Sequence, residues 1–318
     1  MHSFTQLCTT LNTCVNGLTV ALLLSGCSSL RNEVDPSQLG LASPKLVISG
    51  YLSPQDTTLA IKVIRSNTVV GDSLSQLQTG NDITDATVTL SDGNKSVQLQ
   101  YTSTRPTDST RQSYYSASAQ LLPILAGRTY KLSVVTANGQ RASSTCTIPA
   151  PVKLKSITFD SLTQNQGRSL VRRYFIKALW TDPARQDNFY QLVGYFRYRS
   201  KLDQIGNFPL TYDDDNRGLL TDEGLDGTVL VSGRSFLTST TFKTNESTSF
   251  YGQYQTASVT VNLMSVEQTY YRFQEAVIRQ RRVRNNPFAE PVLIPSNIEG
   301  GLGCFAGYNN ATTTFTLK

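Results

Sequence analysis

The stretch "DATVTLSDGNKSVQLQYT", residues 85–102, holds two runs of alternating apolar and polar residues on either side of one tight turn. The apolar residues that share a face are Ala86, Val88 and Leu90 in the first run and Val97, Leu99 and Tyr101 in the second. Period-2 spacing of this kind is typical of half-buried antiparallel strands. Asp92-Gly93 lies between the runs, where tight hairpins favour residues that accept a positive φ. The stretch therefore predicts a β-hairpin.

The same alternation continues on both sides of this hairpin. Further runs are "LVISGYL", "TLAIKVI", "YYSASA", "TYKLSVV" and "RASSTCTI", and Asn138-Gly139 marks a second tight turn. Seven such strands within residues 45–148 predict an immunoglobulin-like or transthyretin-like β-sandwich. The segment "IPAPV" follows, and each proline removes a backbone donor and fixes φ. We therefore expect a stiff linker at residues 149–152 and a second domain at residues 153–318.

The second domain is also predicted to be rich in β-structure, with one long helix. Its strands are expected in "SLVRRYFIKALWTD", "NFYQLVGYFRYRSK" and "TASVTVNLM", and "GGLGCFAGYNNATTTFTLK" is expected to form a glycine-rich turn and a last strand. The helix is predicted at about residues 265–282, where Ser265 and Gln268 have the spacing of a capping box. Its apolar stripe would consist of Val266, Tyr270, Phe273 and Val277. The expected fold is mainly β.

Near the amino terminus, "LLLSGCSS" at residues 22–29 joins an apolar run to a cysteine and small polar residues. The run from Val15 to Leu24 is too short to span a bilayer, which needs about 20 residues, but it suits a signal peptide. The sequence Leu24-Ser25-Gly26-Cys27 resembles the bacterial lipobox, in which the cysteine is acylated and becomes the first residue. We expect a lipoprotein signal peptide at residues 1–26, palmitate on Cys27 and a flexible tether at residues 27–44. The alternative is an ordinary signal peptide, or a short core helix, with a chance cysteine.

The histidine and cysteine content limits the chemistry of the processed chain. The only histidine, His2, would leave with the signal peptide, which excludes a Ser-His-Asp triad and removes the commonest zinc, copper and iron ligand. We therefore expect no catalytic residues, no metal and no cofactor. Cys8 and Cys14 would also be removed. Cys146 and Cys304 remain, and we favour buried free thiols over a disulfide between them.

An acid-rich stretch, "LTYDDDNRGLLTDEGLDGTVL", occupies residues 210–230. Its candidate partner or calcium contacts are Asp213, Asp215, Asp222, Glu223 and Asp226, with Asp214 beside them. The spacing of an EF-hand fails, because its fifth and twelfth positions fall on Arg217 and Gly224. We favour a solvated loop between strands. A calcium or partner site is the second interpretation, and glycoside hydrolysis by paired carboxylates is the third.

Basic residues gather at the end of the predicted helix. They are Arg279, Arg281, Arg282 and Arg284. The net charge of the chain is +6, but export argues against a nucleic-acid partner. Anionic lipid headgroups, lipopolysaccharide or an acidic protein surface are better candidates for an anionic contact. The simpler interpretation is that solvated arginines complement the helix dipole.

Several motifs together resemble a known family. They are the lipobox, "KLVISGYLS", "DATVTLSDGN", "LAGRTYKLSVVTANGQ", "TIPAPV", "NFYQLVGYF", "LLTDEGLDGTVL", "SVEQTYYRFQEA" and "NPFAEPVLIPSNIEGGLGCFAGY". Their order and spacing resemble domain-of-unknown-function family 4249, lipoproteins of Bacteroidota usually encoded beside TonB-dependent receptors. The resemblance implies an accessory lipoprotein of the outer membrane and brings no catalytic residues.

The expected function is therefore that of a non-catalytic binding subunit of a TonB-dependent nutrient importer. Such a protein would be anchored by lipid to the outer membrane, with the cell surface as one orientation, and would have a TonB-dependent barrel as its partner. A structural or adhesive surface lipoprotein is the first alternative. A secreted carbohydrate-active hydrolase that uses the acidic stretch is the second.

Overall fold

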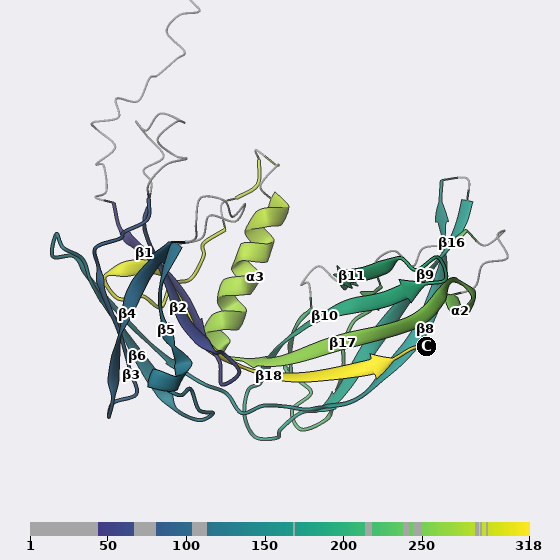
Figure 1. The fold of residues 1–318 in the computed structure, drawn as a ribbon, viewed down its shortest axis with the longest axis horizontal. Helices are drawn as coiled ribbons and strands as arrows, with labels where there is room; N and C mark the ends of the chain where they lie inside the picture. The colour runs from purple at the N-terminus through teal and green to yellow at the C-terminus, as the bar shows by residue number, and fades with distance from the viewer. Residues whose placement is uncertain are drawn as a thin grey trace, which may run out of the picture. The chain divides into compact units, whose positions relative to one another are not determined.

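The structure is a computed structural model, and it describes residues 44–66, 81–103, 113–167, 169–213, 218–237, 242–243, 250–283, 286, 288–290 and 292–318. The predicted signal peptide, the lipobox with Cys27 and, apart from Pro44, the tether lie outside these residues. Asp214, Asp215 and Arg284 lie outside them as well. The described chain is mainly β, as the sequence predicts (Figure 1).

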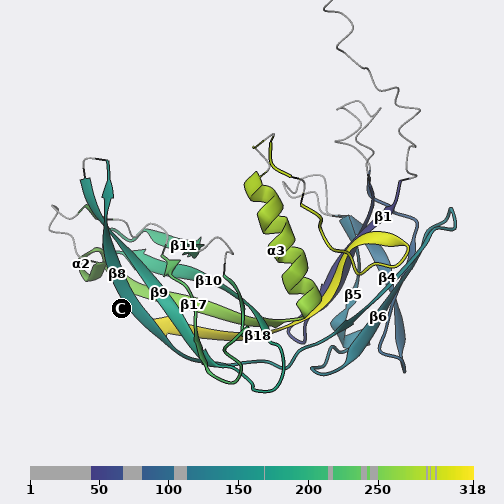
Figure 2. The same ribbon diagram turned by 180° about the vertical axis from the view of Figure 1, so that it is seen from behind.

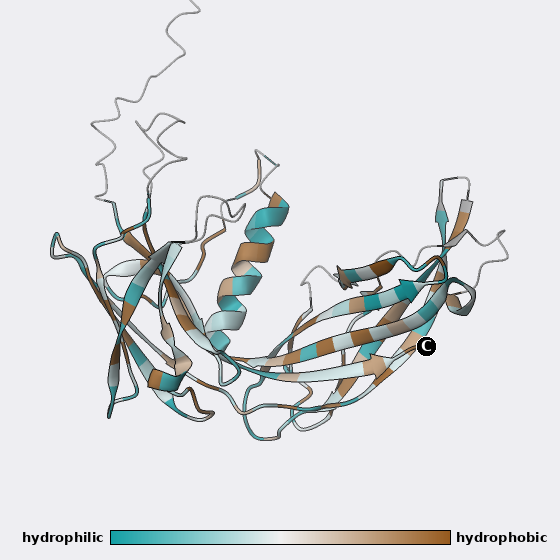
Figure 3. Cartoon of the chain, in the orientation of Figure 1, coloured by the Kyte–Doolittle hydropathy of each residue, from teal (hydrophilic) through white to brown (hydrophobic). Residues whose placement is uncertain are grey.

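All seven strands predicted in residues 45–148 are present. They are β1 (Leu46–Leu52), β2 (Thr58–Arg65), β3 (Thr87–Ser91), β4 (Ser96–Ser103), β5 (Ser113–Ser118), β6 (Thr129–Val135) and β7 (Arg141–Thr147), with a short 3-10 helix, η2 (Ala119–Leu121), after β5. The predicted hairpin is confirmed, because Val88 pairs with Leu99 and Leu90 with Val97. Gly93 takes a φ of 91° in its turn. The hydropathy of these strands alternates along their length (Figure 3).

The seven strands form two layers around one apolar core. The strand β4 joins the layers, because Val97 and Leu99 pair with β3 whereas Tyr101 pairs with Tyr115 of β5. Alternate residues of β1, β2, β3, β4, β6 and β7 are buried between the layers over at least part of each strand, and β5 buries Tyr115. The sequence predicts this burial because successive side chains of a strand point to opposite faces.

Residues 153–318 contain the remaining elements. The strands are β8 (Leu154–Gln166), β9 (Ser169–Thr181), β10 (Phe189–Ser200), β11 (Ile205–Pro209), β12 (Thr211–Tyr212), β13 (Leu219–Thr221), β14 (Val229–Val231), β15 (Ser235–Phe236), β16 (Phe242–Lys243), β17 (Tyr254–Val266) and β18 (Gly301–Thr316). The helices are α2 (Phe250–Gln253) and α3 (Gln268–Val283). The four long strands β9, β10, β17 and β18 were predicted. The strand β8 and the short strands were not.

Two sheets face each other in this part of the chain. In one, β9 pairs with β8, β14, β15 and β16. In the other, β10 pairs with β11, β13 and β17, and β17 pairs with β18. The core between them is aromatic, with Trp180 of β9 in edge contact with Tyr190 of β10 at 5.3 Å between ring centroids. The segment between β7 and β8 has no regular secondary structure, and the predicted domain boundary within it stays a prediction.

The last strand, β18, is shared by two partners. Its first residues pair in parallel with β1, where Leu46 lies opposite Gly301 and Leu52 opposite Gly307. Its later residues pair antiparallel with β17. The strand therefore continues one sheet from β10 and β17 into β1 and β2. This pairing requires Gly303, whose φ is 116° and whose Cα faces the carbonyl oxygen of Ile48 so closely that a Cβ would lie 2.0 Å from that oxygen.

The helix α3 begins later than predicted. Ser265 and Val266 belong to β17 and pair with Asn309 and Tyr308 of β18, so the predicted capping box is wrong. These pairings hold Ser265 in the strand, and its buried hydroxyl has no hydrogen-bond partner among the described residues. Glu267 instead precedes the helix. Its carbonyl oxygen accepts from the amide of Tyr271 at 3.1 Å.

The buried face of α3 packs on the surface made by β18, β1 and β10. Tyr270, Tyr271, Ala276 and Ile278 are buried, whereas Phe273 and Val277 of the predicted stripe are only half-buried. Tyr270 contacts Tyr51 of β1 edge to face, with ring centroids 5.2 Å apart. The predicted packing against a sheet is therefore confirmed, but the buried face is rotated toward Tyr271 and Ile278. No helix in the described ranges is long and apolar enough to cross a membrane.

Candidate functional site

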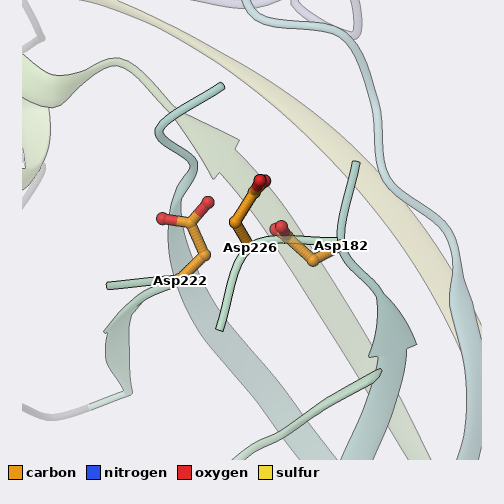
Figure 4. Close-up of side chains that lie close together, drawn as sticks. All are labelled: Asp182, Asp222 and Asp226. Atoms are coloured by element: carbon orange, nitrogen blue, oxygen red, sulfur yellow. The ribbon is translucent and has the colours of Figure 1, made fainter. Parts of the chain in front are cut away.

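Three aspartates of the described chain converge where two loops meet (Figure 4). Asp182 directly follows β9, and Asp222 and Asp226 lie between β13 and β14. Their nearest carboxylate oxygens all lie within 4.8 Å of one another. Asp182 and Asp222 are buried, and Asp226 is exposed. We call these three residues the aspartate cluster.

Hydrogen-bond donors hold the two buried carboxylates in place. Asp182 accepts from the Tyr190 hydroxyl at 2.6 Å and from the Gly227 amide at 3.1 Å. Asp222 accepts from the backbone amide of Asn188 at 3.0 Å. Burying a carboxylate costs free energy unless such donors compensate for the lost water. Burial, and then the bond to Asp182, raise the pKa of Tyr190, so its hydroxyl stays protonated and remains a donor.

The exposed member of the cluster fixes the loop after β9. Both carboxylate oxygens of Asp226 accept from the backbone amide of Arg185, at 2.9 and 3.1 Å. Arg185 has a φ of 72°, a conformation that is uncommon for a residue with a side chain. Gly227 also has a positive φ, of 69°, which lets its amide reach Asp182. The cluster thus ties residues 182–188 to residues 222–228.

The cluster contains only part of the predicted acidic site. Asp222 and Asp226 lie in it, but Glu223 is exposed beside it. Asp213 instead pairs with Arg234, at 2.6 Å between Oδ2 and Nη2. Asp182 was not predicted. The only local signal for it is an acid at the end of the apolar strand "KALWTD".

Chemically, the cluster offers carboxylate oxygens to a hard cation, and calcium prefers such ligands. All three carboxylates already accept hydrogen bonds from the protein, and we call this arrangement, which joins the two loops, the clamp. Calcium binding by Asp213, Asp215, Asp222, Glu223 or Asp226 stays a prediction.

A second candidate site lies at the carboxyl end of α3. Arg279, Arg281 and Arg282 are exposed there, and Arg279 lies 3.8 Å from Glu275 one turn earlier. After the helix, Phe288 and Leu293 expose 93% and 91% of their surface. A hollow of about 460 Å³ lies between the last turns of α3 and the residues Ala289, Glu290 and Val292. We call Arg281, Arg282, Phe288 and Leu293 the α3 tip.

The two remaining cysteines are free and buried, which confirms the predicted thiols. Burial raises the pKa of the Cys304 thiol to about 12, and the nearby Glu267 carboxylate adds to the shift. Burial also raises the pKa of Cys146. Because the thiolate is the reactive form of cysteine, neither side chain has the properties of a nucleophile.

Comparison with known protein families gives a match over most of the chain. A family model described as "Domain of unknown function (DUF4249)" matches residues 31–314. No curated protein matches the chain.

Proposed function

Because this chain belongs to the DUF4249 family, we propose that it is a lipid-anchored outer-membrane protein that serves a TonB-dependent nutrient importer as a non-catalytic binding subunit. The gene neighbourhood that the resemblance implies supports the choice of importer. The proposed partner is the barrel of that importer.

The lipobox is the observation that carries this proposal. Leu24-Ser25-Gly26-Cys27 ends an apolar run, and the first described strand begins at Leu46. Acyl chains contribute roughly 0.8 kcal/mol per buried methylene, and two or more chains give stable anchoring. The folded part would therefore be held at a membrane by residues that precede it.

The chemistry of the described residues supports a binding role rather than a catalytic one. The buried carboxylates of Asp182 and Asp222 accept hydrogen bonds that join two loops. The raised pKa of Cys304, to about 12, keeps its thiol protonated. His2, the only histidine of the chain, precedes the lipobox. The carboxylates are held by hydrogen bonds within the protein and the thiol stays protonated, so we propose no reaction for these groups.

The proposed contact with the barrel lies in residues 213–226, a stretch that includes the short strand β13. Asp213, Glu223 and Asp226 are exposed there. Although Asp213 also pairs with Arg234 and Asp226 accepts from the Arg185 amide, this stretch can present acids to a basic partner surface. Exposed charges at the rim of an interface mainly set the encounter rate and the salt dependence of binding. We therefore expect binding to the barrel to weaken as salt is added.

The anchor is tested by labelling cells with a palmitate analogue. The native chain should incorporate the label, and Cys27→Ala should remain an unlabelled precursor. Cys8→Ala and Cys14→Ala are matched controls, because both residues precede the lipobox, and both variants should label normally. Labelling of Cys27→Ala at the native level would contradict the proposed anchor.

The orientation is tested with an amine reagent that does not cross membranes. If the protein faces the cell surface, its lysines should react in intact cells as fully as in lysed cells. Protection in intact cells, with reaction only after lysis, would place it in the periplasm and favour the structural alternative.

A further inference from the structure

The α3 tip combines large apolar side chains with arginines. Phe288 and Leu293 are almost fully exposed, although single side chains of this size usually bury most of their surface. Ile294 follows Leu293 and is also exposed. Exposed apolar patches rimmed by polar residues mark surfaces that contact another molecule, and these three apolar residues lie within seven positions of one another in the sequence.

The charge of this surface is positive. Arg279, Arg281 and Arg282 face solvent around the last turns of α3. The acidic groups on the same elements are Glu275, which pairs with Arg279, and Glu290, which lines the hollow beside the helix end. The arginines outnumber the acids here, and the dipole of α3 favours cations at this end. A partner of negative charge fits this surface.

The α3 tip and the start of the fold lie on one side of the described unit. Near Tyr51, the later part of β1 contacts the first half of α3 through Tyr270 and Gln274. From this contact, α3 runs on toward its carboxyl end, and β1 runs back toward its first residue, Leu46. Both lead to the same side of the described unit, at the top of Figure 1. Figure 2 shows the same from behind. The segment after α3 returns to Gly301, which lies opposite Leu46.

The proposed lipid anchor enters the fold at this side. The chain between Cys27 and Lys45 can span at most about 60 Å when fully extended. The length of this segment limits how far the folded part can lie from the membrane, but length alone does not set the orientation of the folded part. A second contact near the point where the tether enters would fix that orientation.

We propose that the α3 tip docks on anionic phospholipid headgroups of the membrane to which Cys27 is anchored. The inference rests on the proposed function for the anchor, and it names the lipid surface as the anionic partner of the arginines. Phe288 and Leu293 enter the interface between headgroups and acyl chains. Arg281 and Arg282 bind lipid phosphates, for which the guanidinium group is suited.

The test is flotation with vesicles, using the mature chain with Cys27→Ser so that no acyl chain contributes. Vesicles of 70% phosphatidylcholine and 30% phosphatidylglycerol should carry the protein upward, and pure phosphatidylcholine vesicles should carry much less. Each arginine near such a surface contributes about fivefold, so Arg281→Gln with Arg282→Gln should weaken partitioning about 25-fold. Phe288→Ala with Leu293→Ala should weaken it by at least about tenfold.

Matched controls come from the turn between β10 and β11 and its flanking residues. Leu202 and Ile205 expose 83% and 72% of their surface, so Leu202→Ala with Ile205→Ala removes apolar groups that are also largely exposed. Arg197→Gln with Lys201→Gln removes two exposed charges. Both pairs should float like the parent, and circular dichroism should show the same fold in every variant.

Several results would overturn the inference. They are equal flotation with anionic and neutral vesicles, equal losses in the tip and control variants, and tip variants that float normally but no longer co-purify with a protein partner. The last result would assign the tip to a protein interface. The assay uses a chain without acyl groups, so its failure leaves the palmitate test of the anchor unaffected.

Discussion

Replacing Gly303 with alanine is expected to destabilise the fold strongly, because this glycine lies where β18 passes β1. Its φ of 116° is a conformation that residues with a side chain rarely adopt. A Cβ there would lie 2.0 Å from the Ile48 carbonyl oxygen and 2.9 Å from the Ile48 carbonyl carbon. Both atoms are backbone, so no side chain can rotate away, and the two strands must separate locally.

The expected cost has two parts. Holding a residue with a side chain in such a conformation costs about 1–3 kcal/mol. Separating the strands leaves at least one buried backbone group of the ladder without a partner, which costs about 1–3 kcal/mol more. Gly303→Ala should therefore lower the free energy of unfolding by about 4 kcal/mol, a large fraction of the roughly 5–15 kcal/mol of a folded domain.

Gly93→Ala is the matched control. Gly93 has a φ of 91°, but a Cβ at this position meets no atom of the described chain within 4 Å. Its cost should be that of the backbone conformation alone, about 1–3 kcal/mol. The difference between the two variants therefore isolates the close approach of β18 to β1.

The assay is urea unfolding of the mature chain, followed by circular dichroism in the far ultraviolet. The midpoint should fall much further for Gly303→Ala than for Gly93→Ala, with the slope of each transition unchanged. Equal midpoints for the two variants would refute the parallel pairing of β1 with β18.

Three further predictions concern the buried polar groups. Asp182→Asn should lower the free energy of unfolding in urea by about 2 kcal/mol, because one of its two buried hydrogen bonds is lost. Asp226→Asn should lower it by less than half as much, because Asp226 is exposed, and equal losses would contradict the proposed role of the buried carboxylate in joining the two loops. Burial raises the pKa of Glu267, so the native chain should be most stable relative to Glu267→Gln below about pH 4. This difference in stability should fall as pH rises through the folded-state pKa of Glu267, and a rise over the same range would contradict the raised pKa. The thiols of Cys146 and Cys304 should not react with a disulfide reagent at pH 8 until the chain is unfolded, and rapid reaction of the folded chain would show that they are accessible.

The sequence predicts those strands in which apolar residues, which are buried, alternate with polar residues. The strands β1, β2, β3, β4, β6 and β7 bury every second residue over at least part of their length, and the periodicity reports this directly. The strand β8 pairs only with β9, and none of its residues whose burial is described is fully buried. Its sequence, "LKSITFDSLTQNQ", has no regular apolar face, so the periodicity does not predict this strand.

Non-local pairing explains the other differences. Ser265 and Gln268 have the spacing of a capping box, but pairing of Ser265 with Tyr190 on one side and Asn309 on the other keeps it in β17. Asp182 joins Asp222 only because the loops after β9 and β13 meet in space. The parallel pairing of β18 with β1 joins the two ends of the described chain. The partners in each of these contacts lie far apart in the sequence, so no short stretch of it can reveal them.

The most direct test of the proposed function is affinity purification of the lipidated chain from outer membranes solubilised in mild detergent. We predict that a TonB-dependent barrel co-purifies in stoichiometric amount, and that less is recovered at high salt or after Asp213→Asn with Glu223→Gln. Cys304→Ser, which changes only a buried thiol, should retain the barrel. Recovery of the folded, acylated protein without any barrel would contradict the proposed function.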